Sequence, residues 1–246
     1  MIPKIIHYCW FSNDKKPKSI RKCIDSWNRV MPEYEVRCWD GNSFDFDSVP
    51  FVKEAMKAKK YAFAADYVRL YALYTQGGIY LDSDVFVYQS FDPILDNSFF
   101  CGTEAYWANY ELFFRMEAAI MGAEPQHPFI KECLDWYSDK HFTYNFSKAF
   151  PVMPEVISSI AQKWGYRRVN EYQSLDKGCT VFSTSLFTNA LNSDFSNRES
   201  LLAIHQNAGS WIDYSNRGLF YRMCYGLGLM SLYRFVESTR KRLSSK

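Results

Sequence analysis

Residues 61–87 read YAFAADYVRLYALYTQGGIYLDSDVFV and carry the strongest structural signal in the chain. From Tyr61 to Gln76 the residues are mainly good helix formers and aromatics without a proline, which predicts a helix. The Gly77–Gly78 pair supplies the unrestricted backbone that ends a helix. The apolar segments Ile79–Leu81 and Val85–Val87 then predict buried strand on both sides of two acids.

Asp82 and Asp84 are expected to face one side of this strand. Side chains alternate faces in extended backbone, so the two Cα atoms would lie about 6.6 Å apart. Two carboxylates this close repel each other unless a cation lies between them, and Mg²⁺ or Mn²⁺ would also leave positions for the phosphates of a nucleotide diphosphate. Such an ion is a Lewis acid for a departing diphosphate. Two solvated acids in a turn are the commoner case for a bare Asp-x-Asp, but the apolar strand on both sides favours a metal site.

Asp66 and Arg69 are three residues apart on the preceding helix and therefore share a face. They could hydrogen-bond a sugar or ribose hydroxyl and a phosphate, respectively. The alternative is an ordinary salt bridge, worth only about 0.3 to 0.5 kcal/mol on an exposed helix. The rest of this helix is apolar nearly all round, and a buried helix rarely keeps charges without a partner, so a ligand role is favoured.

The chain has 246 residues and a net charge of +2, enough for one catalytic domain with a sizeable core. An aromatic fraction of 18% fits carbohydrate handling as well as an aromatic core. The seven cysteines are scattered without a Cys-x-x-Cys pair, which predicts reduced thiols. The opening MIPKIIHYCW lacks the basic region and apolar core of a signal peptide, so we expect a cytoplasmic protein.

Strand-like and helix-like segments alternate along the chain. Strands are expected at 2–11, 34–39, 118–122 and 179–183, and helices at 15–31, 51–60, 128–137 and 154–164. This alternation predicts an α/β sandwich with a mostly parallel sheet. Ligands of such sheets bind beyond the carboxyl ends of the strands, where Trp10, Asp82 and Asp84 fall. His7, His127 and His141 are expected to be structural, because a lone histidine is more often a satisfied structural residue than a ligand.

Three segments carry a family resemblance: IPKIIHYCWF at 2–11, ADYVRLYALYTQGGIYLDSD at 65–84 and AIHQNAGSW at 203–211. Residues 1–212 resemble glycosyltransferase family 32, the group whose sugar-binding region contains a DXD motif. This family includes yeast mannosyltransferases and bacterial capsule and lipopolysaccharide transferases, and it is related to the clostridial glucosylating toxins. The resemblance implies the GT-A fold, a Rossmann-like sheet flanked by helices, a nucleotide-sugar donor, a divalent metal, and retention of anomeric configuration.

The resemblance also implies roles at the matching positions. Asp66 and Arg69 match the pair that grips the donor sugar and phosphate, and with Asp82 they form the expected catalytic set. Asp82 would bind ribose, sugar or metal, Asp84 would be a firm metal ligand, and His205 matches a late metal ligand.

The expected nucleotide contacts come from three aromatic residues and Asp82. Trp10 matches an aromatic that stacks on the base, and Tyr80 matches a tyrosine that contacts the nucleotide. Trp211 stands where a tryptophan closes over the diphosphate.

Residues 217–246 are expected to form a tail distinct from a catalytic domain at 1–216. The tail has seven basic residues and one acid, a net charge of +6. Since the whole chain has a net charge of +2, residues 1–216 have a net charge of −4. Its apolar run 223–233 is too short to cross a bilayer, which needs about 20 residues. Two interpretations stay equal: an interfacial helix on anionic lipid at the inner face of the plasma membrane, or a helix packed on the domain.

The leading functional hypothesis is a metal-dependent, retaining hexosyltransferase that acts on a hydroxyl of a bacterial surface glycan on a lipid carrier. A UDP-hexose donor follows from the resemblance to the toxins, whereas the yeast branch implies GDP-mannose. A protein acceptor and a silent sugar-nucleotide binding module are the alternatives. A glycoside hydrolase is disfavoured, because its carboxylates must flank the scissile bond at about 5 to 9.5 Å.

Overall fold

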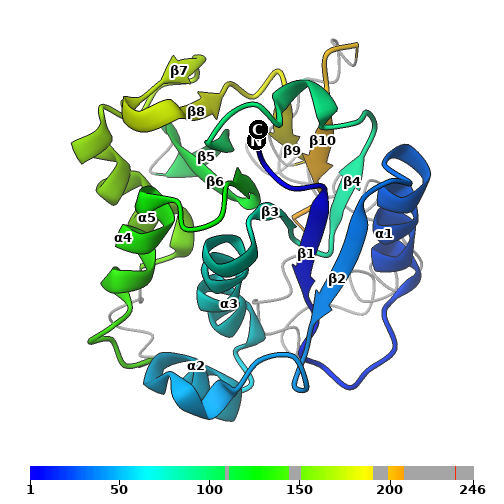
Figure 1. Ribbon diagram of the computed structural model, residues 1–246, viewed down its shortest axis with the longest axis vertical. Coiled ribbons are helices and arrows are strands. Elements are labelled where there is room, and N and C mark those ends of the chain that lie inside the picture. The colour runs from blue at the N-terminus through cyan, green and yellow to red at the C-terminus, as the bar shows by residue number, and fades with distance from the viewer. Residues whose placement is uncertain (109–110, 144–150, 191–198, 208–235, 237–246) are drawn as a thin grey trace.

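The structure is a computed structural model that describes residues 1–108, 111–143, 151–190, 199–207 and 236. A seven-stranded sheet forms its centre, in the order β2-β1-β3-β6-β5-β8-β7 (Figure 1). These strands are β1 (Ile5–Cys9), β2 (Glu35–Trp39), β3 (Gly78–Leu81), β5 (Phe99–Ala108), β6 (Glu111–Ala123), β7 (Gln173–Ser174) and β8 (Cys179–Phe182). A second sheet has the order β4-β10-β9, from β4 (Val85–Val87), β9 (Phe187–Asn189) and β10 (Ala203–His205).

Five strands of the large sheet point the same way. β1 is parallel to β2 and β3, and β5 is parallel to β8, while β6 runs antiparallel to both β3 and β5 and β7 antiparallel to β8. The predicted α/β fold with a mostly parallel sheet is therefore confirmed, and the sheet is mixed. The antiparallel β6 lets the β5–β6 hairpin extend past the carboxyl end of β3, since Leu81 at that end pairs with Ile120.

The helices are α1 (Lys18–Val30), α2 (Pro50–Lys57), α3 (Tyr61–Gln76), α4 (Pro128–Trp136) and α5 (Met153–Ala161). Alternate residues of β3 point into two separate cores: Tyr80 packs into the core that contains α2 to α5, and Ile79 and Leu81 pack into the core that contains α1 and β4. Apolar side chains thus cover both faces of the sheet, as expected for an α/β sandwich. Among the described residues, no helix is both long and apolar enough to cross a membrane.

The segment between Asp82 and Asp84 differs from the prediction. β3 and β4 belong to different sheets, and the residues between them form a tight turn in which the amide of Val85 donates to the carbonyl of Asp82 (2.9 Å). The expected continuous strand through both aspartates is wrong, because β3 pairs with β1 and β6 whereas β4 pairs with β10. The acids share a side because of this turn rather than because of strand alternation.

The end of α3 is attached to the sheet through His7. The indole of Trp39 donates to His7 Nδ1 (3.1 Å), so the proton is on Nε2, which donates to the carbonyl of Gly77 (2.8 Å). Burial lowers the pKa of His7 to about 4. A Cβ on Gly78 would lie 2.6 Å from the Ile5 carbonyl oxygen, so this close approach of β1 and β3 requires glycine. His7 is structural, as predicted.

Helix α1 holds β4 in place on the other side of the turn. The indole of Trp27 donates to the carbonyl of Val85 (2.8 Å), and the amide of Val87 donates to the hydroxyl of Ser26 (3.0 Å). All of these groups are buried. The turn with the two aspartates is therefore fixed at both ends, by the sheet before it and by α1 after it.

Of the seven cysteines, the six that the structure describes are free thiols, as expected. Cys224 and the tail lie outside the described residues, apart from Val236. The division between 1–216 and 217–246 therefore stays a prediction.

Candidate active site

A cavity of about 540 Å³ opens where β1 and β3 end. The predicted site residues that the structure describes all contribute to its lining: Trp10, Asp66, Arg69, Tyr80, Asp82, Asp84 and His205. Trp211 lies outside the described residues, so its expected place over the diphosphate stays a prediction.

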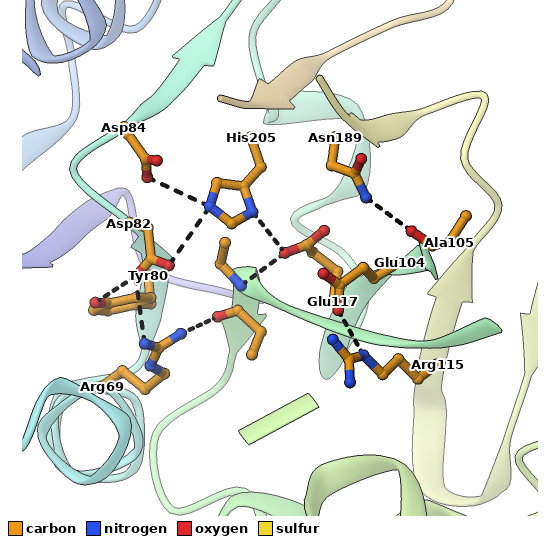
Figure 2. A network of polar contacts seen from close by, with 12 residues as sticks. Arg69, Tyr80, Asp82, Asp84, Glu104, Ala105, Arg115, Glu117, Asn189 and His205 are labelled. Atoms are coloured by element: carbon orange, nitrogen blue, oxygen red, sulfur yellow. Dashed lines mark hydrogen bonds and ion pairs between the residues drawn. The ribbon is translucent and has the colours of Figure 1, made fainter. Parts of the chain in front are cut away.

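Asp82, Asp84 and His205 form one cluster at this cavity (Figure 2). One potential ligand atom from each of the three lies within 4.8 Å of the others. His205 Nε2 is 3.4 Å from Asp84 Oδ1 and 4.0 Å from Asp82 Oδ2. The antiparallel pairing of β10 with β4 sets His205 opposite Val85, directly beside the turn. Backbone pairing thus brings the histidine to the aspartates.

Glu117 on β6 completes the cluster, and the sequence analysis did not single it out. Its carboxylate lies 3.2 Å from His205 Nδ1 and accepts a hydrogen bond from the amide of Ala119 (3.2 Å). With Nδ1 facing this carboxylate, Nε2 faces the aspartates. Burial alone would lower the pKa of His205, but the carboxylates of Asp84 and Glu117 outweigh it and raise that pKa well above its usual value. In the sequence, Glu117 was marked only as a single acid beside the small residues of a predicted strand.

Arg69 connects α3 to the aspartate turn. Its Nη2 lies 3.0 Å from Asp66 Oδ1 and 3.4 Å from Asp82 Oδ1, its Nη1 donates to the Ala118 carbonyl (2.6 Å), and its Nε donates to the Ala65 carbonyl (3.3 Å). Two of its N–H groups are thus used in hydrogen bonds to backbone carbonyls, and its charge pairs with both aspartates. With a side chain only 5% exposed, Arg69 holds the two aspartates in place and brings a positive charge to the cavity.

Asp66 and Tyr80 complete this part of the lining. Burial raises the pKa of Asp66 to about 7, against the opposing effect of Arg69. The hydroxyl of Tyr80 donates to Asp82 Oδ1 (2.9 Å), and its ring lies under the Arg69 guanidinium, 4.6 Å from ring centre to carbon. Asp66 and Arg69 share one face of α3, as predicted. They form an ion pair with each other, and both also line the cavity.

Trp10 directly follows β1 at the cavity wall. Its indole donates to the carbonyl of Asp14 (3.1 Å), and the ammonium of Lys16 lies 5.4 Å from its ring centre. The ring is half-buried, so part of it is open to the cavity. The expected stacking of a base on Trp10 stays a prediction.

The charges around the cavity fit a divalent cation. Around the aspartate turn, four buried or half-buried carboxylates line it against one guanidinium and one imidazole with a raised pKa: Asp66, Asp82, Asp84 and Glu117 against Arg69 and His205. An uncompensated excess of buried negative charge is costly. Carboxylate oxygens are the ligands that Mg²⁺ and Mn²⁺ prefer, and Asp82 and Asp84 supply them beside the His205 nitrogen. A cation held there would act as a Lewis acid toward a diphosphate.

Comparison with known proteins agrees with this geometry. Residues 17–100 match the family model described as the glycosyltransferase sugar-binding region containing DXD motif. The matched range includes Asp66, Arg69, Tyr80 and both aspartates of the turn.

Two yeast proteins are similar in sequence. Inositol phosphoceramide mannosyltransferase 3 of Schizosaccharomyces pombe is 28% identical over 66% of this chain, and mannosyl phosphorylinositol ceramide synthase CSH1 of Saccharomyces cerevisiae is 29% identical over 59%. The chain spans 46% and 37% of these two relatives, less than half of their lengths.

A solved glycosyltransferase involved in glycosylation of the major capsid of PBCV-1 has a similar fold, with a TM-score of 0.51 and 12% identity. The alignment covers 85% of this chain and 98% of that one. Residues 17–100 therefore match the glycosyltransferase sugar-binding region containing DXD motif, and the described strands and helices have the GT-A fold.

Proposed function

We propose that this chain transfers a hexose, with retention of configuration, from a nucleotide-diphosphate sugar to a hydroxyl group, using a divalent cation held by Asp82, Asp84 and His205. One observation carries the proposal: the three ligand atoms converge within 4.8 Å at a cavity that Trp10 and Arg69 also line. A cation site beside the positive charge of Arg69 suits a diphosphate, and a half-buried indole suits a base.

The reaction breaks the bond between the anomeric carbon and the phosphate oxygen. The electron pair leaves with the diphosphate, the acceptor oxygen bonds to the anomeric carbon, and the acceptor proton passes to the departing diphosphate. Arg69 contributes a fixed positive charge close to where that negative charge develops, and such preorganised electrostatic stabilisation is commonly the largest single contribution to catalysis. We assign no covalent nucleophile to this chain.

For the donor sugar we propose mannose. The resemblance to glucosylating toxins indicates a UDP-hexose, but both yeast relatives are named for mannosyl transfer. The alternative donor raised by the sequence, GDP-mannose, is therefore the first candidate, and UDP-hexoses are the competing donors.

For the acceptor we propose a hydroxyl on the polar headgroup of a lipid-anchored molecule. A surface glycan on a lipid carrier has such hydroxyls, and the names of the yeast relatives include an inositol-bearing ceramide. A cytoplasmic enzyme that works at the inner face of the plasma membrane is consistent with this acceptor, and a protein acceptor is the alternative.

A donor screen tests the proposal. UDP- and GDP-linked sugars are compared by thermal shift and by nucleotide release, each with Mn²⁺, Mg²⁺ or EDTA. We expect one donor to stabilise the protein and to be hydrolysed slowly only with metal. Binding without nucleotide release, even with acceptors present, would indicate a silent binding module instead.

Two matched variants separate the metal site from general effects of charge. Asp84→Asn removes a proposed ligand, and Asp25→Asn removes an exposed carboxylate on α1 that does not line the cavity. We expect the first to lose metal-dependent nucleotide release by at least a hundredfold and the second to retain it. Unchanged metal-dependent turnover in folded Asp84→Asn would show that the cation site is wrongly assigned.

A further inference from the structure

A second polar feature of the cavity lies on the β5–β6 hairpin. Glu104 and Arg115 are directly paired across this hairpin, and both line the cavity (Figure 2). Arg115 Nε donates to Glu104 Oε2 (2.7 Å), and the two side chains are only 17% and 12% exposed, respectively. The aromatic ring of Tyr106 supports the guanidinium at 4.2 Å. The pair is therefore rigid and largely removed from solvent.

The pair retains unused hydrogen-bonding groups. Among the described residues, Arg115 makes one side-chain hydrogen bond, from its Nε to Glu104 Oε2. The terminal Nη groups of Arg115 and the Oε1 atom of Glu104 remain available. None of these atoms is both fully buried and without a hydrogen-bond partner, so solvent reaches them. A polar ligand in the cavity would take the place of that solvent.

The position of the pair separates it from the donor contacts. Along the order β1-β3-β6-β5, Trp10 follows β1, the aspartates follow β3, and Glu104 lies on β5. Adjacent strands are about 4.8 Å apart, so β1 and β5 are separated by roughly 14 Å. A donor whose base lies at Trp10 and whose diphosphate lies at Asp82 and Asp84 would point its sugar toward β6 and β5. The acceptor must reach the sugar from that end.

The charges define the ligand. Glu117 and Glu104 are close neighbours on this wall, and each adds negative charge beside Arg115, which disfavours an anionic acceptor group at this end. Arg115 donates hydrogen bonds and Glu104 accepts them, and the two side chains lie side by side. The pair therefore matches two neighbouring hydroxyls of a ligand, one that accepts from Arg115 and one that donates to Glu104. A serine, threonine or tyrosine side chain has only one hydroxyl.

We propose that Glu104 and Arg115 form the acceptor subsite and that the acceptor is a neutral ring polyol, a sugar or a cyclitol, bound through two adjacent hydroxyls. This inference rests on the proposed transferase function and extends it, because it selects a polyol over a protein hydroxyl. The apolar residues Val152, Met153 and Pro154 also line the cavity and can contact the CH groups of such a ring.

The test separates the two halves of the reaction. With the donor found in the screen, hydrolysis to water reports on the donor site alone, and transfer to myo-inositol or methyl α-mannopyranoside reports on the acceptor. A serine- and threonine-containing peptide serves as the protein acceptor. We expect wild-type protein to transfer to at least one polyol and not to the peptide.

Glu104→Gln and Arg115→Lys keep side-chain size while changing the paired groups. Both are expected to raise the KM for the polyol at least tenfold while donor KM and hydrolysis stay within twofold. Glu35→Gln is the matched control, since Glu35 forms the same kind of ion pair with Arg37 on β2 outside the cavity lining. If a single variant fails to fold, the double variant Glu104→Gln with Arg115→Met removes both charges together and must show the same loss.

Several outcomes would overturn the subsite without touching the transferase function. These are an unchanged polyol KM in the folded variants, a parallel loss of donor hydrolysis that assigns the pair to the donor, or wild-type transfer to the peptide alone. Wild-type donor hydrolysis with transfer to none of the probes would also count against a polyol acceptor. Failure of donor hydrolysis in the wild type would instead contradict the proposed function itself.

Discussion

Replacing Glu117 by glutamine is expected to weaken the binding of Mn²⁺ although Glu117 is not itself a proposed ligand. Its carboxylate lies 3.2 Å from His205 Nδ1, and Nε2 on the other side of the ring faces Asp84 at 3.4 Å. A carboxylate behind a histidine fixes the ring orientation and the tautomer and increases the basicity of the ligating nitrogen. Glutamine keeps the volume and an oxygen for the Ala119 amide but removes the charge.

The size of the effect follows from these contacts. Loss of such an outer partner typically costs 10- to 100-fold in metal affinity, which corresponds to about 1.4 to 2.8 kcal/mol. Because Glu117 is only 3% exposed, solvent screens its charge weakly and the upper part of this range is expected. The apoprotein should keep its thermal stability, since the amide of Ala119 still finds an acceptor.

Calorimetric titration with Mn²⁺ in the absence of nucleotide measures this effect directly. Glu132→Gln on the exposed side of α4 is the control, and Asp84→Asn is the reference for a lost ligand. A dissociation constant within twofold of wild type for folded Glu117→Gln, alongside lost binding in Asp84→Asn, would refute the positioning role.

Three further predictions concern the scaffold. Ser26→Ala leaves the buried amide of Val87 without its acceptor, which should lower the free energy of unfolding by about 1 to 3 kcal/mol in urea titrations; a neutral effect would mean that α1 does not hold β4. Gly122→Ala places a Cβ 2.2 Å from the buried Phe100 ring and should cost about 1 to 3 kcal/mol in the same assay, where equal stability would show that the ring moves freely. The pKa of His7 is lowered from 6.5 to about 4 by burial, so its neutral form stabilises the fold fully above pH 6.5. This contribution to the free energy of unfolding, about 3 kcal/mol, is lost as the pH falls from 6.5 to about 4. In His7→Gln, the free energy of unfolding measured in urea titrations should depend less on pH over this window.

Local sequence was sufficient for the elements that depend on near neighbours. The helix at 61–76 appears with those bounds, because helix formers without proline precede two glycines with positive φ. The apolar residues around the aspartates form strands as predicted, and alternation of helices and strands indicated the α/β class. The Asp66–Arg69 and Asp82–Asp84 pairs were recognisable because their spacing is short, whereas the role expected of Trp10 followed from the family resemblance.

Pairings between distant segments decided the rest. The hydrophobic pattern shows that residues 79–81 and 85–87 are strands, but it does not show that they join different sheets, so the aspartates lie in a turn instead of on one strand. The approach of His205 depends on the pairing of β10 with β4. Glu117 and the Glu104–Arg115 pair reach the cavity only because β6 runs antiparallel to β3 and carries the β5–β6 hairpin past the carboxyl end of that strand. The sequence by itself determined which residue types were available for a metal and a nucleotide sugar, whereas strand pairing, a long-range property, determined which charges face each other across the cavity.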